Sequence, residues 1–532
     1  MRKHHLGLTE DLFIPTPMST QHPDNAANPA WAEGEVIEGD TELHEAYFAY
    51  HALRCNEVMW DSEGKDVDTH VIRKLLSKYP DFFQKEVIGE DIFLTYRIPN
   101  PQIEKAERKV VSETLQIIPL SSDVASLFYK RNVVPIFEVI LPFTTSGRQL
   151  LWIHDYYRKV IAGAEGVKLA GSMTVKNWVG AVSPKSIRVI PLVEDMESLL
   201  VIDKIITQYL RAVTTRHLRV FIARSDPALN YGLFCAVLLS KIALSRLQAL
   251  QEKSAVRIYP IIGVGSMPFR GHLSPDNVKR FLAEYKGLAT ATTQSALRYD
   301  YPVEKAKNAV RVLNENLPNG EAAVIGRDEE GFLRSCLEKF KARYQARVEE
   351  LAPLVNSVAS FVPQRRARKL HIGLFGYSRS VKGVTMPRAI PFAAAFYSLG
   401  IPPEFIGAEA LRDLNEKEWN CLRTCYVNMK FDLAFAGNYV SWEGINMLMD
   451  SHESFAKVSG TSRERLRNAL AMLMADLAAV EETFSIKLGP HDHDAKRHEN
   501  FINNFLISYA EGEDTQARTA FVEAAQLRRC LG

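Results

Sequence analysis

The feature that most constrains the fold of this chain is a strand–helix–strand pattern in residues 187–226. Two short apolar runs rich in β-branched residues, 187–193 and 219–223, are each followed closely by acidic residues. Between them, residues 196–216 carry apolar side chains at helical spacing, which predicts one helix. Such a unit places its two strands parallel, so both acidic ends emerge at the carboxyl edge of one sheet. Ligands bind at that edge in barrels and in open α/β sheets.

The acidic residues at these strand ends, Glu194, Asp195 and Asp226, allow two interpretations. Carboxylates held at one sheet edge can bind a divalent cation, because Mg²⁺ and Mn²⁺ prefer oxygen ligands. Acids that follow strands also commonly cap the next helix, and Asp226 before Pro227 suits a helix start. The pattern alone leaves both metal binding and capping open.

Further strand patterns along the chain indicate a barrel. Apolar runs are expected to form additional strands at residues 91–97, 133–141, 257–264 and 369–375. Helical patterns separate these runs, among them 104–118 and 121–131. We therefore expect an α/β fold, a (β/α)8 TIM-type barrel with many additional α-helices. Residues 1–532 would form a single catalytic unit, with an N-terminal segment at 1–40 and a mostly helical C-terminal region at 404–532 packed on the barrel.

Charge and cysteine content narrow the class of protein. The 65 basic and 63 acidic residues of this 532-residue chain leave a net charge of +2, which gives no support to binding of nucleic acid or a membrane surface. The six cysteines are scattered, as expected for reduced thiols. No apolar run approaches the roughly 20 residues of a membrane span, and the N-terminus lacks a secretory signal. We expect a cytoplasmic protein.

Three polar loops carry residues that could bind anions or move protons. His22 precedes Pro23, which restricts the histidine to extended backbone and so directs its ring. Arg270 lies in a glycine-containing loop after the run 257–264, and Arg379 and Arg388 follow the run 369–375. Glycines let backbone amides approach an anion, and arginine adds a bidentate contact to phosphate or carboxylate. A solvated histidine and a purely structural turn remain the alternatives for the first two loops.

Five of these motifs, taken in order, resemble archaeal-type phosphoenolpyruvate carboxylase. They are residues 19–24 (Ser-Thr-Gln-His-Pro-Asp), 191–195 (Pro-Leu-Val-Glu-Asp), 223–226 (Ala-Arg-Ser-Asp), 263–271 (Gly-Val-Gly-Ser-Met-Pro-Phe-Arg-Gly) and 388–391 (Arg-Ala-Ile-Pro). The resemblance extends from about residue 18 to the end of the sequence. Several motifs in the order of the family make it specific, whereas any single one would not.

The resemblance implies a biotin-free enzyme that depends on Mg²⁺ or Mn²⁺. It would convert phosphoenolpyruvate and bicarbonate into oxaloacetate and inorganic phosphate, through carboxyphosphate and a metal-bound enolate. Glu194 and Asp226 match the metal ligands, and His22 matches the histidine that handles carboxyphosphate. Arg270 and Arg388 match catalytic arginines that hold phosphate and carboxylate groups. By position near these motifs, the substrate-binding set would also include Arg224, Gln294, Arg298 and Arg379.

The resemblance also implies a homotetramer, built as a dimer of dimers. Aspartate or malate would be the inhibitors, with Arg528 and Arg529 as a candidate contact. Two other functions remain as alternatives: a different metal-dependent lyase that acts on a 2-oxo or acyl-thioester substrate, and a catalytically inactive barrel kept as a metabolite-binding or scaffold subunit. Bicarbonate-dependent phosphate release would distinguish the carboxylase from both.

Overall fold

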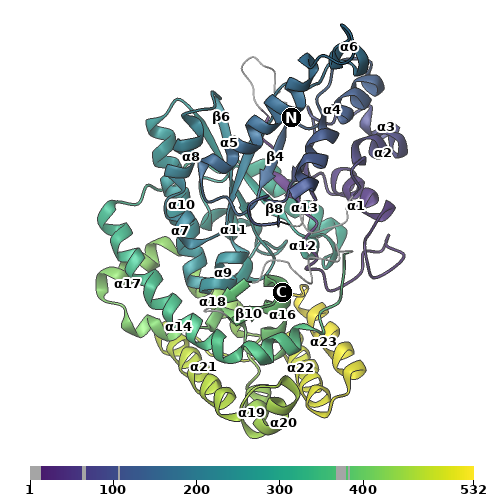
Figure 1. Cartoon of the computed structure of the whole chain (residues 1–532). Helices are drawn as coiled ribbons and strands as arrows, with labels where there is room; N and C mark the ends of the chain where they lie inside the picture. The colour runs from purple at the N-terminus through teal and green to yellow at the C-terminus, as the bar shows by residue number, and fades with distance from the viewer. Residues whose placement is uncertain (1–12, 63–67, 106–107, 367–378, 382–383) are drawn as a thin grey trace.

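Eight parallel strands close into a barrel at the centre of the molecule (Figure 1). The structure, a computed structural model, describes residues 13–62, 68–105, 108–366, 379–381 and 384–532. Each strand pairs with the next one along the chain, and the first pairs with the last. The strands are β1 (Pro17–Ser19), β2 (Glu57–Asp61), β3 (Phe93–Arg97), β4 (Glu138–Leu141), β5 (Arg188–Val193), β6 (His217–Ala223), β7 (Arg257–Gly263) and β8 (Thr290–Thr293). The predicted (β/α)8 barrel is confirmed.

The strand–helix–strand unit forms as expected, with one difference. Strands β5 and β6 are parallel neighbours, and Val193 lies opposite Ile222, so the residues that follow both strands reach the same rim. The intervening segment forms two helices, α7 (Met196–Leu199) and α8 (Ile202–Leu210), instead of the single helix predicted for residues 196–216. Val201 leaves the helical region of backbone space (φ −131°, ψ 22°), which separates the two helices. The apolar spacing predicted the buried face, but it contained no signal for this break.

The interior of the barrel is layered along its axis. Near the amino ends of the strands, Arg219 donates to both carboxylate oxygens of Glu57 (2.8 and 2.6 Å) and to Glu138 (3.3 Å). A separate apolar layer follows, made of Met18, Met59, Ile140, Ile190, Leu192, Phe221, Ala223 and Ile261. Such alternate filling by neighbouring strands makes a TIM barrel a packed core instead of a pore. This apolar layer separates the Arg219 ion pairs from the polar pocket described below, which Met59, Leu192 and Phe221 also line.

Helices surround this barrel on its outer face (Figure 1). The two helices predicted at 104–118 and 121–131 are wrong: a single helix, α4 (Arg108–Tyr129), replaces them and continues through Pro119. The long helix after β6 is apolar enough to cross a membrane, but 72% of its most apolar window is buried inside the protein. The helices up to β8 are α1 (Asp40–His51), α2 (Val71–Lys78), α3 (Pro80–Phe83), α4 (Arg108–Tyr129), α5 (Gly147–Tyr156), α6 (Val175–Val179), α7, α8, α9 (Ser225–Tyr231), α10 (Leu233–Lys253) and α11 (Val278–Glu284).

From residue 327 onward, the chain forms a second group of helices, coloured green to yellow in Figure 1, whereas residues 295–316 lie beside the barrel. The elements after β8 are α12 (Ser295–Tyr299), α13 (Val303–Asn316), α14 (Arg327–Ala359), β9 (Arg379–Val381), β10 (Val384–Met386), α16 (Ala389–Ser398), α17 (Glu416–Cys425), α18 (Met429–Gly437), α19 (Trp442–Asp450), α20 (His452–Ser459), α21 (Arg463–Phe484), α22 (His493–Glu511) and α23 (Asp514–Arg528). Helix α14 packs on both α16 and α21 and so ties this group together. The strand predicted at 369–375 lies outside the described residues.

Candidate active site

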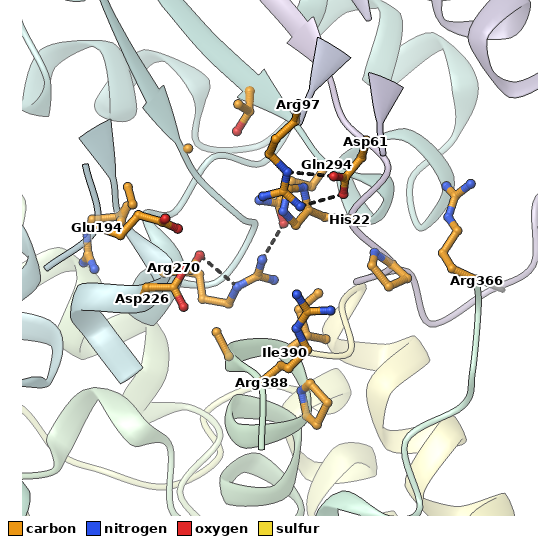
Figure 2. A pocket seen from close by; sticks show the side chains of 18 of the residues that line it. His22, Asp61, Arg97, Glu194, Asp226, Arg270, Gln294, Arg366, Arg388 and Ile390 are labelled. Atoms are coloured by element: carbon orange, nitrogen blue, oxygen red, sulfur yellow. Dashed lines mark hydrogen bonds and ion pairs between the residues drawn. The ribbon is translucent and has the colours of Figure 1, made fainter. Parts of the chain in front are cut away.

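A pocket of about 290 Å³ opens at the carboxyl ends of the barrel strands (Figure 2). Its lining combines strand ends from β2, β3, β5 and β6 with the segment after β1, the turn after β7, and residues 362–366 and 388–391. Seven of the predicted site residues line it: His22, Glu194, Arg224, Asp226, Arg270, Gln294 and Arg388. The fold thus brings together motifs that are up to 366 positions apart in the sequence.

The three strand-end acids divide between the two interpretations given above. Asp195 is a helix cap, because its side chain accepts from the Ser198 amide (2.8 Å) at the start of α7. Glu194 turns into the pocket, where one oxygen accepts from the Phe143 amide (2.6 Å). Asp226 also lines the pocket, from the first turn of α9, whose N-cap residue is Arg224. Capping therefore describes Asp195, whereas Asp226 lies in the first turn of α9 and not at its N-cap.

The two pocket carboxylates, Glu194 and Asp226, lie on the same side of the cavity (Figure 2). Hard divalent cations take oxygen ligands, and Mg²⁺ usually binds through one or two carboxylates while keeping waters or substrate oxygens. Within the described residues, no group of three or more His, Cys, Asp or Glu side chains could form a closed metal cage. The donor set therefore fits an open Mg²⁺-type site and does not fit a structural zinc site.

Arg270 lines the pocket, and its side chain is held in place by several hydrogen bonds. It ends a short 3₁₀ turn, η4 (Pro268–Arg270), and its side chain is 1% exposed. Its guanidinium donates to the main-chain oxygen of Gly532 (2.5 Å), Gln294 Oε1 (2.5 Å), Ser225 Oγ (3.2 Å) and Asp24 Oδ2 (3.4 Å). Four acceptors from separate segments leave this guanidinium a single orientation, as a preorganised anion contact requires.

Two predicted substrate-binding residues line the pocket while also supporting Arg270. Gln294 precedes α12 and accepts from Arg270, as described above. Arg224 donates to the carbonyls of Phe269 (3.0 Å) and Pro268 (3.4 Å) and to the hydroxyl of Tyr285 (3.1 Å). These hydrogen bonds hold the η4 turn, so Arg224 fixes the position of Arg270.

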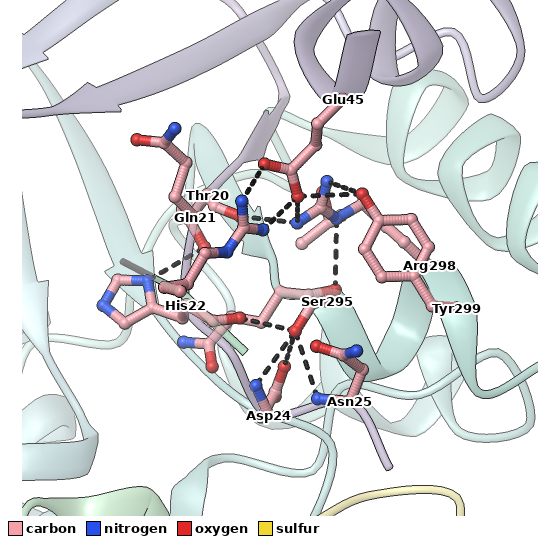
Figure 3. A network of polar contacts seen from close by, with 12 residues as sticks. Thr20, Gln21, His22, Asp24, Asn25, Glu45, Ser295, Arg298 and Tyr299 are labelled. Carbon is pink, nitrogen blue, oxygen red and sulfur yellow. Dashed lines mark hydrogen bonds and ion pairs between the residues drawn. The ribbon is translucent and has the colours of Figure 1, made fainter. Parts of the chain in front are cut away.

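The segment that carries His22 is fastened to β8 and α12 (Figure 3). Ser295 Oγ lies 2.5 Å from the His22 carbonyl oxygen and 2.8 Å from Asp24 Oδ1, so either oxygen can accept its one proton. Asp24 Oδ1 also accepts from the Ala296 amide (2.7 Å). On the imidazole itself, Nδ1 lies 3.0 Å from Thr20 Oγ1. The ring is half-buried at the pocket wall.

The remaining predicted arginines do not all reach the cavity. Arg298 is absent from the described lining; its guanidinium donates to the Thr20 carbonyl (2.6 Å) and the Tyr299 hydroxyl (2.9 Å) and pairs with Glu45 (3.1 Å). Figure 3 shows it beside Glu45 and Tyr299, and its bond to the Thr20 carbonyl supports the segment that carries His22. Arg388 lines the pocket as the N-cap residue of α16. The backbone of Arg379 belongs to β9, but its side chain lies outside the described part of the structure.

Sequence reasoning missed a pair of charged residues in the pocket wall. Asp61 ends β2 and Arg97 ends β3, and the arginine donates to both carboxylate oxygens (2.7 and 2.6 Å). The two residues are direct neighbours in the β2–β3 register. The sequence predicts a strand that ends in Arg97, but the partner of this arginine, Asp61, follows only from the pairing of β2 with β3.

A second missed group lies where α14 leads back to the pocket. Arg366 lines the pocket and donates to both oxygens of Glu45, a buried residue of α1. Burial alone would raise the pKa of Glu45, but the guanidiniums of Arg366 and Arg298 lower it to about 2. Glu45 is therefore a permanent anion that holds two arginines around the His22 segment.

Arg528 and Arg529, the candidate contact for an inhibitor, differ in burial. Arg528 is buried, donates to the Leu531 carbonyl (3.2 Å) and lies 2.7 Å from His498 Nε2. Burial lowers the pKa of Arg528 to about 10. Arg529 has a 41% exposed side chain, 3.5 Å from Asp276. Of the two arginines, only Arg529 could contact a soluble effector at the surface.

Comparison with known proteins identifies the family. A family model described as phosphoenolpyruvate carboxylase matches residues 14–532. The phosphoenolpyruvate carboxylase of Metallosphaera sedula is 46% identical over 519 residues, which are 98% of this chain and 99% of the relative. That of Caldivirga maquilingensis is 46% identical over 98% of this chain and 100% of the relative, and that of Picrophilus torridus is 44% identical over 98% and 99%. The chain therefore belongs to the archaeal-type phosphoenolpyruvate carboxylase family.

Proposed function

We propose that the pocket at the carboxyl end of the barrel carboxylates phosphoenolpyruvate with bicarbonate, as the family does. The observation that carries this assignment is the composition of one cavity. Carboxylates (Glu194, Asp226), guanidiniums (Arg270, Arg388) and an imidazole (His22) all line it. The reaction needs each of these chemistries, because it moves a phosphoryl group, generates an enolate and transfers a proton.

Glu194 and Asp226 are the residues we propose to hold Mg²⁺ or Mn²⁺. When bound there, such an ion would polarise a substrate oxygen and stabilise the negative charge that develops on it. The backbone amide of Phe143, which donates to Glu194, would fix the direction of that carboxylate. The scheme uses no biotin, because transfer of the phosphoryl group to bicarbonate already activates the carbon.

The proposed reaction has two stages. An oxygen of bicarbonate attacks phosphorus and the bond from phosphorus to the C2 oxygen breaks, giving carboxyphosphate and the enolate of pyruvate. Carboxyphosphate then breaks its C–O bond to give CO₂ and phosphate, while His22 takes the carboxyl proton and returns it to phosphate. C3 of the enolate attacks CO₂ and forms the new C–C bond of oxaloacetate. Arg270 and Arg388 would hold the anionic groups in place throughout both stages.

The assembly and location of the protein also belong to this proposal. We propose a homotetramer, arranged as a dimer of dimers, in the cytoplasm, on the strength of the family resemblance. Sedimentation analysis of the purified protein tests the tetramer directly. A stable monomer with full activity would contradict it.

The proposed role of His22 can be tested by following both possible products. Wild-type protein should make oxaloacetate from phosphoenolpyruvate only when bicarbonate and Mg²⁺ or Mn²⁺ are both present. A His22→Asn variant should bind phosphoenolpyruvate but form pyruvate, or stop, because the proton transfer to phosphate is lost. His51→Asn, which changes an exposed histidine at the end of α1, is the matched control. Oxaloacetate production by His22→Asn at the wild-type rate would remove His22 from the mechanism.

A further inference from the structure

Glu404 is a buried acid outside the pocket with an unusual set of neighbours. It lies in the short 3₁₀ turn η5 (Pro403–Phe405), and its side chain is 0% exposed. The structure describes no ion pair to it within 4 Å, although Arg528, over the ring of Tyr397, acts on it at longer range. A buried carboxyl group without a direct cationic partner is costly to ionise, and burial raises the pKa of Glu404 to about 7, so its presence needs a reason.

The contacts of Glu404 join two elements that carry pocket arginines. Its Oε1 accepts from the Phe269 amide (2.8 Å) and from the Tyr397 hydroxyl (2.7 Å). Phe269 belongs to the η4 turn that ends in Arg270, whereas Tyr397 belongs to α16, the helix that begins just after Arg388. One carboxyl oxygen therefore links the supports of both arginines.

The bond to Phe269 fills a need created by the η4 turn itself. Amides in the first turn of a helix lack an acceptor within that helix, and a buried amide without an acceptor is unfavourable. Glu404 supplies this acceptor, while Arg224 holds the Phe269 carbonyl (3.0 Å) from the other side. The turn is thereby fixed at both polar groups of the residue that precedes Arg270.

A second contact shows that η4 and α16 are packed as one unit. The ring of Phe269 stacks on the ring of Phe392 of α16, with centroids 5.7 Å apart and an interplanar angle of 22°. Stacking holds the two elements in contact, but it permits sliding along the ring faces. The directional hydrogen bonds to Glu404 restrict that sliding.

We propose that Glu404 is a positioning residue, which sets the separation between Arg270 and Arg388 by holding η4 against α16. The inference rests on the proposed roles of these two arginines in substrate binding. Glu404 touches no substrate itself, so its effect should fall on the binding of phosphoenolpyruvate more than on the chemical step.

Three variants test this role by separating KM from kcat. Glu404→Gln keeps an acceptor oxygen and should leave KM for phosphoenolpyruvate within about threefold of wild type, because the bond to the Phe269 amide survives. Glu404→Leu removes the acceptor and should raise that KM at least about tenfold, with a smaller change in kcat. Tyr397→Phe removes one bond without changing ring volume and should raise KM by about threefold.

A matched control is available in Glu284, another buried acid that accepts from a backbone amide (Asn428, 2.7 Å) and does not line the pocket. Glu284→Leu should leave KM for phosphoenolpyruvate unchanged. If Glu404→Leu does not fold, Glu404→Gln and Tyr397→Phe still decide the question, because both preserve the local volume. Wild-type KM in Tyr397→Phe, or an equal loss in Glu404→Gln and Glu404→Leu, would overturn the proposal.

An Arg270→Gln variant separates failure of this inference from failure of the proposed function. If Arg270→Gln raises KM strongly and the Glu404 variants do not, only the positioning role is wrong. If Arg270→Gln itself binds phosphoenolpyruvate like wild type, the proposed role of Arg270 is wrong, and the inference drawn from it falls as well.

Discussion

Gly271, the residue after Arg270, allows the clearest test of how the site is built. Its φ is +117°, a conformation that side chains rarely adopt. A Cβ at this position would lie 2.4 Å from Val264 Cγ1, 2.8 Å from Val264 Cβ and 3.3 Å from Arg224 Cγ. Gly271→Ala therefore introduces both backbone strain and a steric clash next to the residue expected to hold the substrate anion.

The magnitude follows from these two costs. A positive φ costs a residue with a Cβ about 1–2 kcal/mol, and forcing an extra methyl group into a packed core costs about 1–3 kcal/mol. We expect Gly271→Ala to lose about 2–5 kcal/mol of unfolding free energy. Relief of the clash should move the η4 turn, and weakening one charge-assisted hydrogen bond from Arg270 would raise KM for phosphoenolpyruvate about tenfold or more.

Gly320 provides the matched control, because it also has a positive φ (+91°) but has no atom within 4 Å of its Cβ position. Gly320→Ala should show the backbone cost alone, with no change in KM. Urea denaturation measures the first quantity and initial rates of phosphate release measure the second. If the two alanine variants have the same stability and the same KM, the reasoning about the η4 turn is refuted.

Three further predictions concern charged groups inside the protein. Arg219→Met leaves the buried carboxylate of Glu57 without its partner and should cost about 3–5 kcal/mol of unfolding free energy. KM for phosphoenolpyruvate should stay constant, because the apolar layer lies between this ion pair and the pocket. A raised KM would contradict that separation. Asp61→Asn breaks the bidentate pair with Arg97 in the pocket wall, so the unfolding free energy and kcat should both fall. Wild-type stability and wild-type kcat in this variant would show that the pair is dispensable. Burial raises the pKa of Asp300 from 3.8 to about 8, so the native state binds this proton more tightly than the unfolded chain does. Wild-type stability should therefore fall relative to Asp300→Asn as pH rises from about 4 to about 8, and urea denaturation at about pH 5 and about pH 9 should give different stability gaps, whereas equal gaps would contradict the shift.

Much of the barrel could be predicted because its determinants are local. The apolar runs that became β5 and β6 are continuous and β-branched, and the acids after them mark where the strands end. Parallel pairing then forces Glu194 and Asp226 to one rim, whatever the rest of the chain does. Local sequence does not decide which acid caps a helix and which lines the pocket. Asp195 and Glu194 are adjacent, yet only the tertiary structure shows that the first caps α7 and the second lines the pocket.

Other features depend on partners that are distant in the sequence. Gln294 and Arg298 are four positions apart, but Arg298 turns to Glu45 and the Thr20 carbonyl, whereas Gln294 reaches the pocket and Arg270. The ion pair of Asp61 and Arg97 needs the register of β2 against β3, which no motif contains. His22 could be placed over the site only through the family resemblance, since its own loop has no pattern that fixes its position.

The most direct test of the account is a titration of Mn²⁺ into the purified protein, followed by calorimetry, with Asp226→Asn and Asp195→Asn as paired variants. The account predicts one tight site in wild type, loss of about tenfold or more in affinity for Asp226→Asn, and wild-type affinity for Asp195→Asn, whose carboxylate only caps α7. Unchanged affinity in Asp226→Asn, or an equal loss in both variants, would contradict a metal site built from Glu194 and Asp226.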